Sequence, residues 1–230
     1  MTFTDIKNRV YFLTSANSTD YPIADLTLAA NRALEKVVAL INQSDMRWQF
    51  DDTNQTDLPI ATATITSGQQ DYSLATTHLT IDRIEVKNTA GNWHVLSQID
   101  QQAFKGEDQI ALAEYKETSG IPEEYDILGS SIFLYPTPNF TQAASLKVYF
   151  TRGPVAFTTA DAAETPGFNT LFHDLIPLYV AKDYAVAKGK KNLPVIYSEI
   201  DKLEKSIEKF YQLRNRDFRG RIIPTMESNK

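Results

Sequence analysis

The first fifty residues carry hydrophobic side chains at helical spacing. A first helix is expected to begin at Thr4, a residue type favoured as an N-cap, and to end in the turn formers of residues 15–22. A second helix is predicted over about residues 24–43. The apolar face of the first comprises Ile6, Val10 and Leu13, and that of the second comprises Leu26, Ala30, Ala33, Val37 and Leu40. Such stripes are typical of helices packed on other helices.

Between residues 58 and 157 the pattern changes to alternation of hydrophobic and polar side chains, which predicts strands. The strands are expected near residues 60–66, 71–73, 79–87, 93–97, 125–128, 131–135 and 145–152. Tight turns are expected at 88–91 and 128–131, and a short helical insertion at 99–113. In the third of these strands Ile84 and Val86 point to one face of the sheet, and Arg83, Glu85 and Lys87 point to the other.

Helical spacing returns after the loop of residues 158–167. Asn169 is expected to cap a helix with Pro177 as a kink, and Asn192 is expected to cap the last helix. The inward positions are Leu171, Phe172, Leu175, Ile176, Tyr179 and Tyr184 in the first of these helices and Ile196, Ile200, Leu203, Ile207 and Phe210 in the second. The second set forms a coiled-coil-like seam. Residues 218–230 have no period.

These patterns predict an α+β protein, in which an α-helical bundle formed by the N- and C-terminal helices carries an inserted antiparallel β domain. The expected parts are the N-terminal helices (1–50), the β domain (51–157), the C-terminal helices (158–216) and an extended tail (217–230).

Composition excludes several kinds of protein. With 42% hydrophobic and 23% charged residues, the chain can build a core without a metal or disulfide. It has no cysteine, which excludes thiolate chemistry and fits assembly in a reducing compartment. Neither a secretory signal nor a membrane segment is expected, since no stretch approaches the roughly 18 apolar residues of a membrane span.

Charge is uneven along the chain. The net charge of −6 argues against a protein whose whole surface binds DNA. Residues 182–221 hold eleven Lys and Arg against six Asp and Glu, so the C-terminal end is basic and the rest is acidic. This basic end is interpreted either as a solvated helix face or as a docking surface for an acidic partner.

No arrangement of residues predicts catalysis, a cofactor or a metal. Phosphate-binding loops and nucleophile elbows are absent. His78, His94 and His173 are far apart, and surface or capping roles are expected for them rather than metal ligation. The carboxylate pairs at 51–52 and 123–124 are adjacent in sequence, so on a strand they point to opposite faces and suit joint catalysis poorly. The chain is therefore predicted not to be an enzyme.

The β segment resembles a known family. Residues 71–74 and 79–86 are followed by Gly-Ile-Pro at 120–122, a hairpin, a strand ending in Pro-Thr-Pro at 136–138, and a last strand over 146–154. This order, with the flanking helices, is similar to that of tailed-bacteriophage head–tail adaptor (connector) proteins, and the likeness covers about residues 58–216.

The resemblance implies a virion structural protein at the neck, between the capsid portal and the tail, assembled in the bacterial host cytoplasm. Its implied partners are the portal protein, tail or nozzle proteins, and neighbouring copies in a dodecameric ring. Double-stranded DNA would pass through without sequence-specific binding, and no membrane is involved. The C-terminal helix and tail would reach the portal.

The C-terminal tail gives the candidate portal-docking residues. It combines basic and apolar side chains that could order on a partner, whereas the simpler interpretation is a frayed terminus. The candidates are Arg214, Arg216, Phe218, Arg219, Arg221, Ile222 and Ile223. Two other functions stay open. One is a virion-associated cell-wall hydrolase, and the other is a carbohydrate-binding tail or fibre component that uses exposed aromatics such as Trp93.

Overall fold

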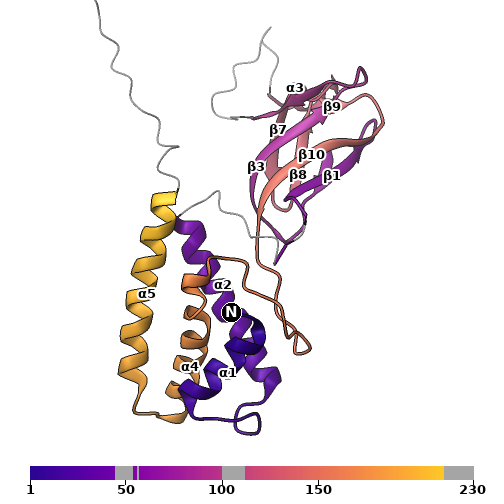
Figure 1. Cartoon of the computed structure of the whole chain (residues 1–230). Coiled ribbons are helices and arrows are strands. Elements are labelled where there is room, and N and C mark those ends of the chain that lie inside the picture. The colour runs from indigo at the N-terminus through magenta and orange to yellow at the C-terminus, as the bar shows by residue number, and fades with distance from the viewer. Residues whose placement is uncertain (45–53, 56, 100–111, 215–230) are drawn as a thin grey trace, which may run out of the picture. The chain divides into compact units, whose positions relative to one another are not determined.

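The chain divides into two compact units (Figure 1). The structure, a computed structural model, describes residues 1–44, 54–55, 57–99 and 112–214. The helical unit comprises Met1–Thr56 and Pro154–Lys230, and the β unit comprises Asp57–Gly153. Helices from both ends of the chain share one unit, which confirms the α+β fold with a β domain inserted into a helical bundle.

The helical unit is built around one central helix. Its elements among the described residues are α1 (Phe3–Thr14), α2 (Ile23–Ser44), the 3-10 helix η2 (Thr170–Phe172), α4 (Leu175–Lys188) and α5 (Leu193–Arg214). α4 packs against α1, α2 and α5, and eight of its 14 residues are buried. A helix covered on several sides is hydrophobic around most of its circumference, and α4 fits that description.

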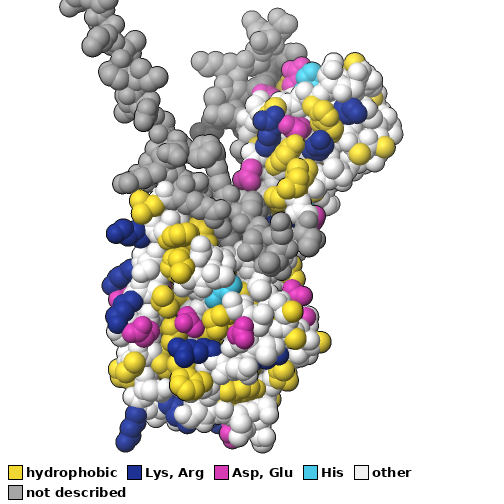
Figure 2. All heavy atoms as spheres, in the orientation of Figure 1, with side chains coloured by type: hydrophobic (Ala, Val, Ile, Leu, Met, Phe, Trp, Pro, Cys, Tyr) yellow, Lys and Arg dark blue, Asp and Glu magenta, His cyan; other side chains and the backbone are white. Residues whose placement is uncertain are grey.

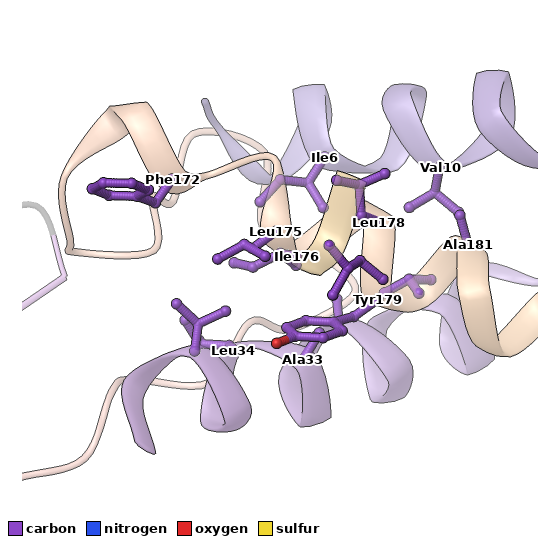
Figure 3. Close-up of a cluster of buried hydrophobic side chains, with 14 of the residues drawn as sticks. Ile6, Val10, Ala33, Leu34, Phe172, Leu175, Ile176, Leu178, Tyr179 and Ala181 are labelled. Carbon is purple, nitrogen blue, oxygen red and sulfur yellow. The ribbon is translucent and has the colours of Figure 1, made fainter. Parts of the chain in front are cut away.

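Side chains from α1 and α2 meet α4 from opposite sides (Figure 3). Ile6 and Val10 of α1 face α4 on one side, and Ala33 and Leu34 of α2 face it on the other. The same core cluster continues to Phe172 of η2 and to α5. Burial of each large apolar side chain contributes roughly 1.5–3 kcal/mol, so this continuous cluster holds helices from both ends of the chain together.

The first helix begins earlier than its sequence pattern predicts. Thr4 is not the N-cap, because α1 starts at Phe3 and Thr2 caps it. The Thr2 Oγ1 accepts a hydrogen bond from the Asp5 N–H (3.3 Å), and the Asp5 carboxylate accepts one from the Thr2 N–H (2.9 Å). These bonds hold the pKa of Asp5 below its usual range. Phe3 is buried and stacks on Phe157 (4.5 Å between ring centroids), which fixes the start of the helix.

The predicted helix after Asn169 is two elements. Asn169 caps η2, since its side chain accepts a hydrogen bond from the Leu171 N–H (3.0 Å), and α4 begins only at Leu175. Leu171 was expected to point inward but is 69% exposed. Pro177 lies in the first turn of α4, where a helix has no partner for the N–H that proline lacks, so the helix interior is unbroken.

The seam of the last helix is confirmed in its main positions. Ile196, Ile200 and Ile207 are buried, whereas Leu203 and Phe210 are half-buried. Tyr211 was not among the predicted positions but is fully buried, and its hydroxyl accepts a hydrogen bond from the Asn169 N–H (3.3 Å). The predicted inward residues Leu13, Leu40 and Tyr184 are also half-buried.

Two four-stranded sheets form the β unit. Sheet A has the order β1-β10-β3-β4, with β1 (Ile60–Ile65), β3 (His78–Lys87), β4 (Trp93–Val95) and β10 (Gln142–Arg152). Sheet B has the order β2-β8-β7-β5, with β2 (Asp71–Ser73), β5 (Ser97–Gln98), β7 (Glu124–Leu128) and β8 (Ser131–Tyr135). A short pair, β6 (Ser119–Gly120) and β9 (Thr137–Pro138), and helix α3 (Leu112–Glu117) complete the unit.

The two sheets share one core that is separate from the core of the helical unit. Sheet A contributes Ile65, Ile84, Val86, Leu146 and Val148, and sheet B contributes Tyr72, Ile132 and Leu134. Since side chains alternate along each strand, the remaining residues point away from this core. The outer faces of sheets A and B therefore lie on opposite sides of the β unit.

Several strand details differ from the sequence prediction. The strand expected over 93–97 is divided, because β4 pairs with β3 whereas β5 pairs in parallel with β7 in the other sheet. β6 and β9 also pair in parallel, and the other strand pairs are antiparallel. β10 begins at Gln142, before the predicted start at Ser145. The helical insertion expected over 99–113 falls mainly outside the described residues.

An ion pair joins the two ends of the β unit. The Arg152 Nη1 donates to the Asp57 Oδ1 at 2.8 Å, and its Nη2 donates to the Asp57 carbonyl. The Arg152 side chain is 10% exposed, whereas that of Asp57 is 79% exposed. The guanidinium holds the pKa of Asp57 below its usual range. The point where the chain enters the β unit is thus bonded to the point where it leaves.

Candidate interaction surfaces

The predicted portal-docking residues lie almost wholly outside the described part of the chain. Arg214 is the last residue of α5. The others, Arg216, Phe218, Arg219, Arg221, Ile222 and Ile223, fall on residues that the structure does not describe. Docking through this segment therefore stays a prediction.

The outer face of α5 is not the basic surface that the sequence pattern indicates. α5 carries four Lys and Arg and four Asp and Glu, so its charges balance. Lys202 pairs with Glu199 (2.9 Å) and Lys205 pairs with Asp201 (2.7 Å), each one helical turn away. Such exposed pairs contribute about 0.3–0.5 kcal/mol each and are typical of a solvated helix face. The basic excess belongs to Lys188 at the end of α4, to the turn before α5 and to the tail.

The acidic excess of the chain lies in the β unit. That unit holds twelve Asp and Glu against six Lys and Arg, whereas the helical unit holds seventeen of each. The whole net charge of −6 thus belongs to the β unit. Within the β unit, however, three of the six basic side chains share the outer face of sheet A.

We call this outer face the cationic sheet face. The strand register places its residues side by side: Tyr149 is opposite Arg83, Lys147 is opposite Glu85, Glu85 is opposite Val95, and Lys87 is opposite Trp93. The residues of this set comprise three bases and one acid, so their net charge is +2. Figure 2 shows Lys and Arg side chains among apolar ones on the β unit.

Trp93 lies at the exposed edge of the cationic sheet face. It is 38% exposed and its neighbour on the same face, Val95, is 54% exposed. The Lys147 Nζ lies 4.1 Å from the centroid of the indole, and the Lys87 Nζ lies 5.9 Å from it. An ammonium within about 6 Å of an indole is attracted to it by about 0.5–1 kcal/mol at an exposed site. The two lysines are therefore held over the ring.

Glu85 organises the other half of the face. Its carboxylate accepts from Arg83 (2.6 Å, Nη2 to Oε1) and from the Tyr149 hydroxyl (3.0 Å to Oε2). The hydrogen bond to Glu85 raises the pKa of Tyr149, because it favours the protonated phenol. Glu85 is only 9% exposed, and its charge is offset by Arg83 within the face, so it does not cancel the charge of the two half-exposed lysines.

The opposite side of the β unit is acidic. The outer face of sheet B carries Asp71, Asp126 and Glu124, and α3 adds Glu114 and Glu117. α3 lies over this face, since the Tyr115 hydroxyl is hydrogen-bonded to Glu124 and the Lys116 Nζ lies 5.3 Å from the Tyr135 ring centroid. Burial and this carboxylate raise the pKa of Tyr115. We call these five acids, with the single base Lys116, the acidic side; its charge is −4.

A second exposed surface lies at one end of the bundle. Asn192, just before α5, donates from its side chain to the Leu13 carbonyl (2.9 Å), which brings the end of α1 to the turn between α4 and α5. Exposed apolar side chains occur there, namely Phe12 (74%), Val186 (56%) and Val195 (66%). Lys188, the last residue of α4, lies there with Lys190 and Lys191 of the turn. Apolar and basic side chains together suit contact with a protein partner.

The histidines take structural positions, but not all on the surface. His94 is exposed and lies 2.6 Å from the Asn88 amide nitrogen. His78 is half-buried and stacks on Phe150, and burial lowers its pKa. His173 is the C-cap of η2, in agreement with the expected capping role, but it is only 2% exposed and does not lie at the surface. Its Nε2 lies 2.8 Å from the Phe168 carbonyl, and its Nδ1 lies 2.8 Å from the Met1 amine.

The described residues offer little for catalysis or small-ligand binding. No three of their His, Asp or Glu side chains are grouped closely enough to hold a metal ion. Glu124 of the second carboxylate pair is bonded to Tyr115, and the first pair, Asp51-Asp52, lies outside the described residues. A cavity beside β1 and His78 has a volume of about 100 Å³, below the roughly 300 Å³ of small ligand pockets. None of the described helices has both the length and the apolar character needed to cross a membrane.

A comparison with known protein families identifies the family of this chain. The family model described as SU10 adaptor protein matches residues 1–222. The chain belongs to this family, a family of phage head–tail adaptors. The match confirms the resemblance seen in the sequence over about residues 58–216 and extends it to the N-terminal helices. A search of curated proteins finds no match.

Membership in the SU10 adaptor family gives the chain a structural role in a bacteriophage virion. Sequence reasoning reached that role but missed the cationic sheet face. The alternation of Arg83, Glu85 and Lys87 placed these side chains on one outer face, but their neighbours Lys147 and Trp93 depend on strand register. Register between distant strands is set by the whole sheet, so local spacing could not reveal it.

Proposed function

We propose that the chain is the subunit of a head–tail adaptor ring, which binds the portal, surrounds the DNA channel and receives tail components. The observation that carries this proposal is the match of the SU10 adaptor family over residues 1–222. The parts proposed on the sequence, namely N-terminal helices (1–50), β domain (51–157), C-terminal helices (158–216) and tail (217–230), then act together in one ring subunit. The C-terminal tail, with its basic and apolar side chains, is the proposed portal-docking segment.

The charge of the β unit supports a place beside passing DNA. Binding of DNA phosphates is driven by Lys and Arg, and each additional contact strengthens non-specific attachment. A unit with twice as many acids as bases repels the duplex. A channel wall with this charge would let the genome slide past without holding it.

The surface details favour an adaptor over the two alternatives. Carbohydrate binding through Trp93 would need a bare ring face for the sugar, but the Lys147 ammonium lies 4.1 Å from the ring centroid. A hydrolase of the usual two-carboxylate kind needs acids about 5–9.5 Å apart across an open cleft. Glu124, by contrast, is half-buried and bonded to Tyr115.

Native mass spectrometry of the purified chain mixed with the portal ring of the same phage tests the proposal. A discrete complex with one adaptor per portal subunit is expected. Deleting residues 218–230 should leave a folded chain, by circular dichroism, and abolish the complex. A control chain in which a Gly/Ser segment of equal length replaces the deleted residues should also fail to bind. The absence of any complex with the intact, folded chain would refute the adaptor ring, and unchanged binding after deletion would refute docking through the tail.

A further inference from the structure

We propose that, in the ring, the cationic sheet face of one copy packs against the acidic side of the β unit of the next copy. This inference rests on the proposed adaptor ring and assigns its subunit interface. The two surfaces are the outer faces of sheets A and B, which share one core and so point away from each other. Their charges are +2 and −4.

Opposite charges on opposite sides of one unit fit a particular kind of assembly. A contact between two different patches of identical subunits is heterologous, and it closes into a ring when the rotation between neighbours divides a full turn. A growing chain of copies then keeps one free patch of each kind at its two ends until the ring closes. Two cationic sheet faces would repel each other, and so would two acidic sides, so the charges disfavour a two-fold symmetric dimer through either surface.

The cationic sheet face has the composition of an interface rather than that of a simple solvated surface. Trp93, Arg83 and Tyr149 belong to the residue types that dominate binding energy at protein interfaces. Arg83 and Tyr149 are already held by Glu85, and Lys147 is held over Trp93, so little side-chain freedom is lost on contact.

The lysines of this face are available to a partner. Within the described part of the chain, neither Lys87 nor Lys147 forms an ion pair. On the acidic side, Asp71, Glu114 and Glu117 are exposed and likewise form no ion pair with a described residue. Steered association of such surfaces is fast and weakens with salt.

A charge exchange between the two surfaces tests the interface. Variant one carries Lys87→Glu and Lys147→Glu, which changes the charge of the cationic sheet face from +2 to −2. Variant two carries Asp71→Lys, Glu114→Lys and Glu117→Lys, which changes the charge of the acidic side from −4 to +2. The lysines are half-exposed and the three acids are exposed, and folding is checked by circular dichroism. Each variant alone places like charges at every contact, so at least about a tenfold loss of adaptor rings on portal is expected. The control Lys202→Glu with Lys205→Glu makes the same charge change as variant one on the solvated face of α5 and should assemble normally.

Mixing the two variants gives the decisive outcome. The reversed cationic sheet face of variant one complements the reversed acidic side of variant two. The unchanged cationic sheet face of variant two complements the unchanged acidic side of variant one. Rings in which the two variants strictly alternate should therefore reappear in native mass spectra. If either variant alone assembles like the intact chain, the assigned interface is wrong. The same holds if the mixture forms no rings while the control does; in both cases the proposed adaptor ring itself is unaffected. Normal rings of variant one that no longer bind a tail protein or DNA would assign the cationic sheet face to that partner instead. If the intact chain itself forms no ring, the proposed function fails first.

Cysteine cross-linking provides a second measurement, which detects the contact even if the charge substitutions weaken assembly only slightly. The chain has no cysteine, so introduced thiols have no native competitors. Chains with Val95→Cys and Asp71→Cys together should form disulfide-linked ladders on the portal. Chains with either change alone should stay monomeric on reducing-agent-free gels. A disulfide-linked dimer from Val95→Cys alone would indicate a two-fold contact and overturn the proposal.

Discussion

The two separate cores predict that the units unfold independently, and a pair of matched substitutions measures this. Leu175 of α4 is fully buried in the helical unit, and Ile84 of β3 is fully buried in the β unit. No residue belongs to both core clusters. Replacing either residue by alanine should therefore destabilise its own unit and leave the other unchanged.

The magnitude follows from what each substitution removes. A fully buried Leu or Ile replaced by Ala loses its transfer free energy and leaves a cavity, which together cost about 2–5 kcal/mol. Leu175 begins the helix that contacts the three others, so neighbours cannot close the cavity without moving. We expect about 3–4 kcal/mol for Leu175→Ala, a large share of the roughly 5–15 kcal/mol that stabilises a typical domain.

Urea unfolding with two signals separates the units. The sequence has two tryptophans, so Trp48→Phe leaves Trp93 as the only one, and its fluorescence reports the β unit. Circular dichroism at the helical band reports mainly the helical unit. Leu175→Ala should lower the dichroism midpoint and leave the fluorescence midpoint in place, and Ile84→Ala should do the reverse. Equal shifts of both midpoints for either substitution would refute independent cores, and a loss below about 1 kcal/mol for Leu175→Ala would refute the central role of α4.

Three further predictions concern local contacts. Thr2→Ala removes the N-cap of α1 and should lower the free energy of unfolding of the helical unit by about 1 kcal/mol in urea titrations, while Thr2→Ser should change it little. Burial, with Asp183 and Asp25 nearby, raises the pKa of Tyr21 to about 12, so the folded state binds that proton more tightly than the unfolded state. The resulting stability is complete below about pH 10 and should decline as pH rises towards 12, and Tyr21→Phe should flatten the decline. Arg152→Lys keeps the charge but loses the two-pronged contact with Asp57, so the melting temperature from Trp93 fluorescence should fall; an unchanged value would show that the contact adds nothing.

Sequence predicts the elements that depend on near neighbours. Ile196, Ile200 and Ile207 recur every three to four residues, and the structure buries all three on one side of α5. The sequence also contains the capping box of α1, since Thr2 and Asp5 have the required spacing. Thr4, however, is an equally suitable residue type for the N-cap. The choice depended on Phe3, whose partner Phe157 is distant in sequence.

Features that depend on distant partners could not be predicted. His173 is buried because its ring nitrogens lie beside the Phe168 carbonyl and the Met1 amine, and Met1 is 172 residues away. The division of the strand over 93–97 depends on sheet B, since β5 leaves sheet A to pair with β7. Periodicity indicates on which face of its own helix or strand a side chain lies. Tertiary packing decides which other part of the protein that face contacts.

The bond between Arg152 and Asp57 has a consequence for how this family can diverge. Because the β unit begins and ends at one bonded point, exchanging it for another sheet with closely spaced ends would leave the helices undisturbed. A phage lineage could thus exchange the β unit by recombination within the gene while the helices kept their sequence. Mosaic genes, with breakpoints near codons 57 and 153, are the signature that such a history would leave.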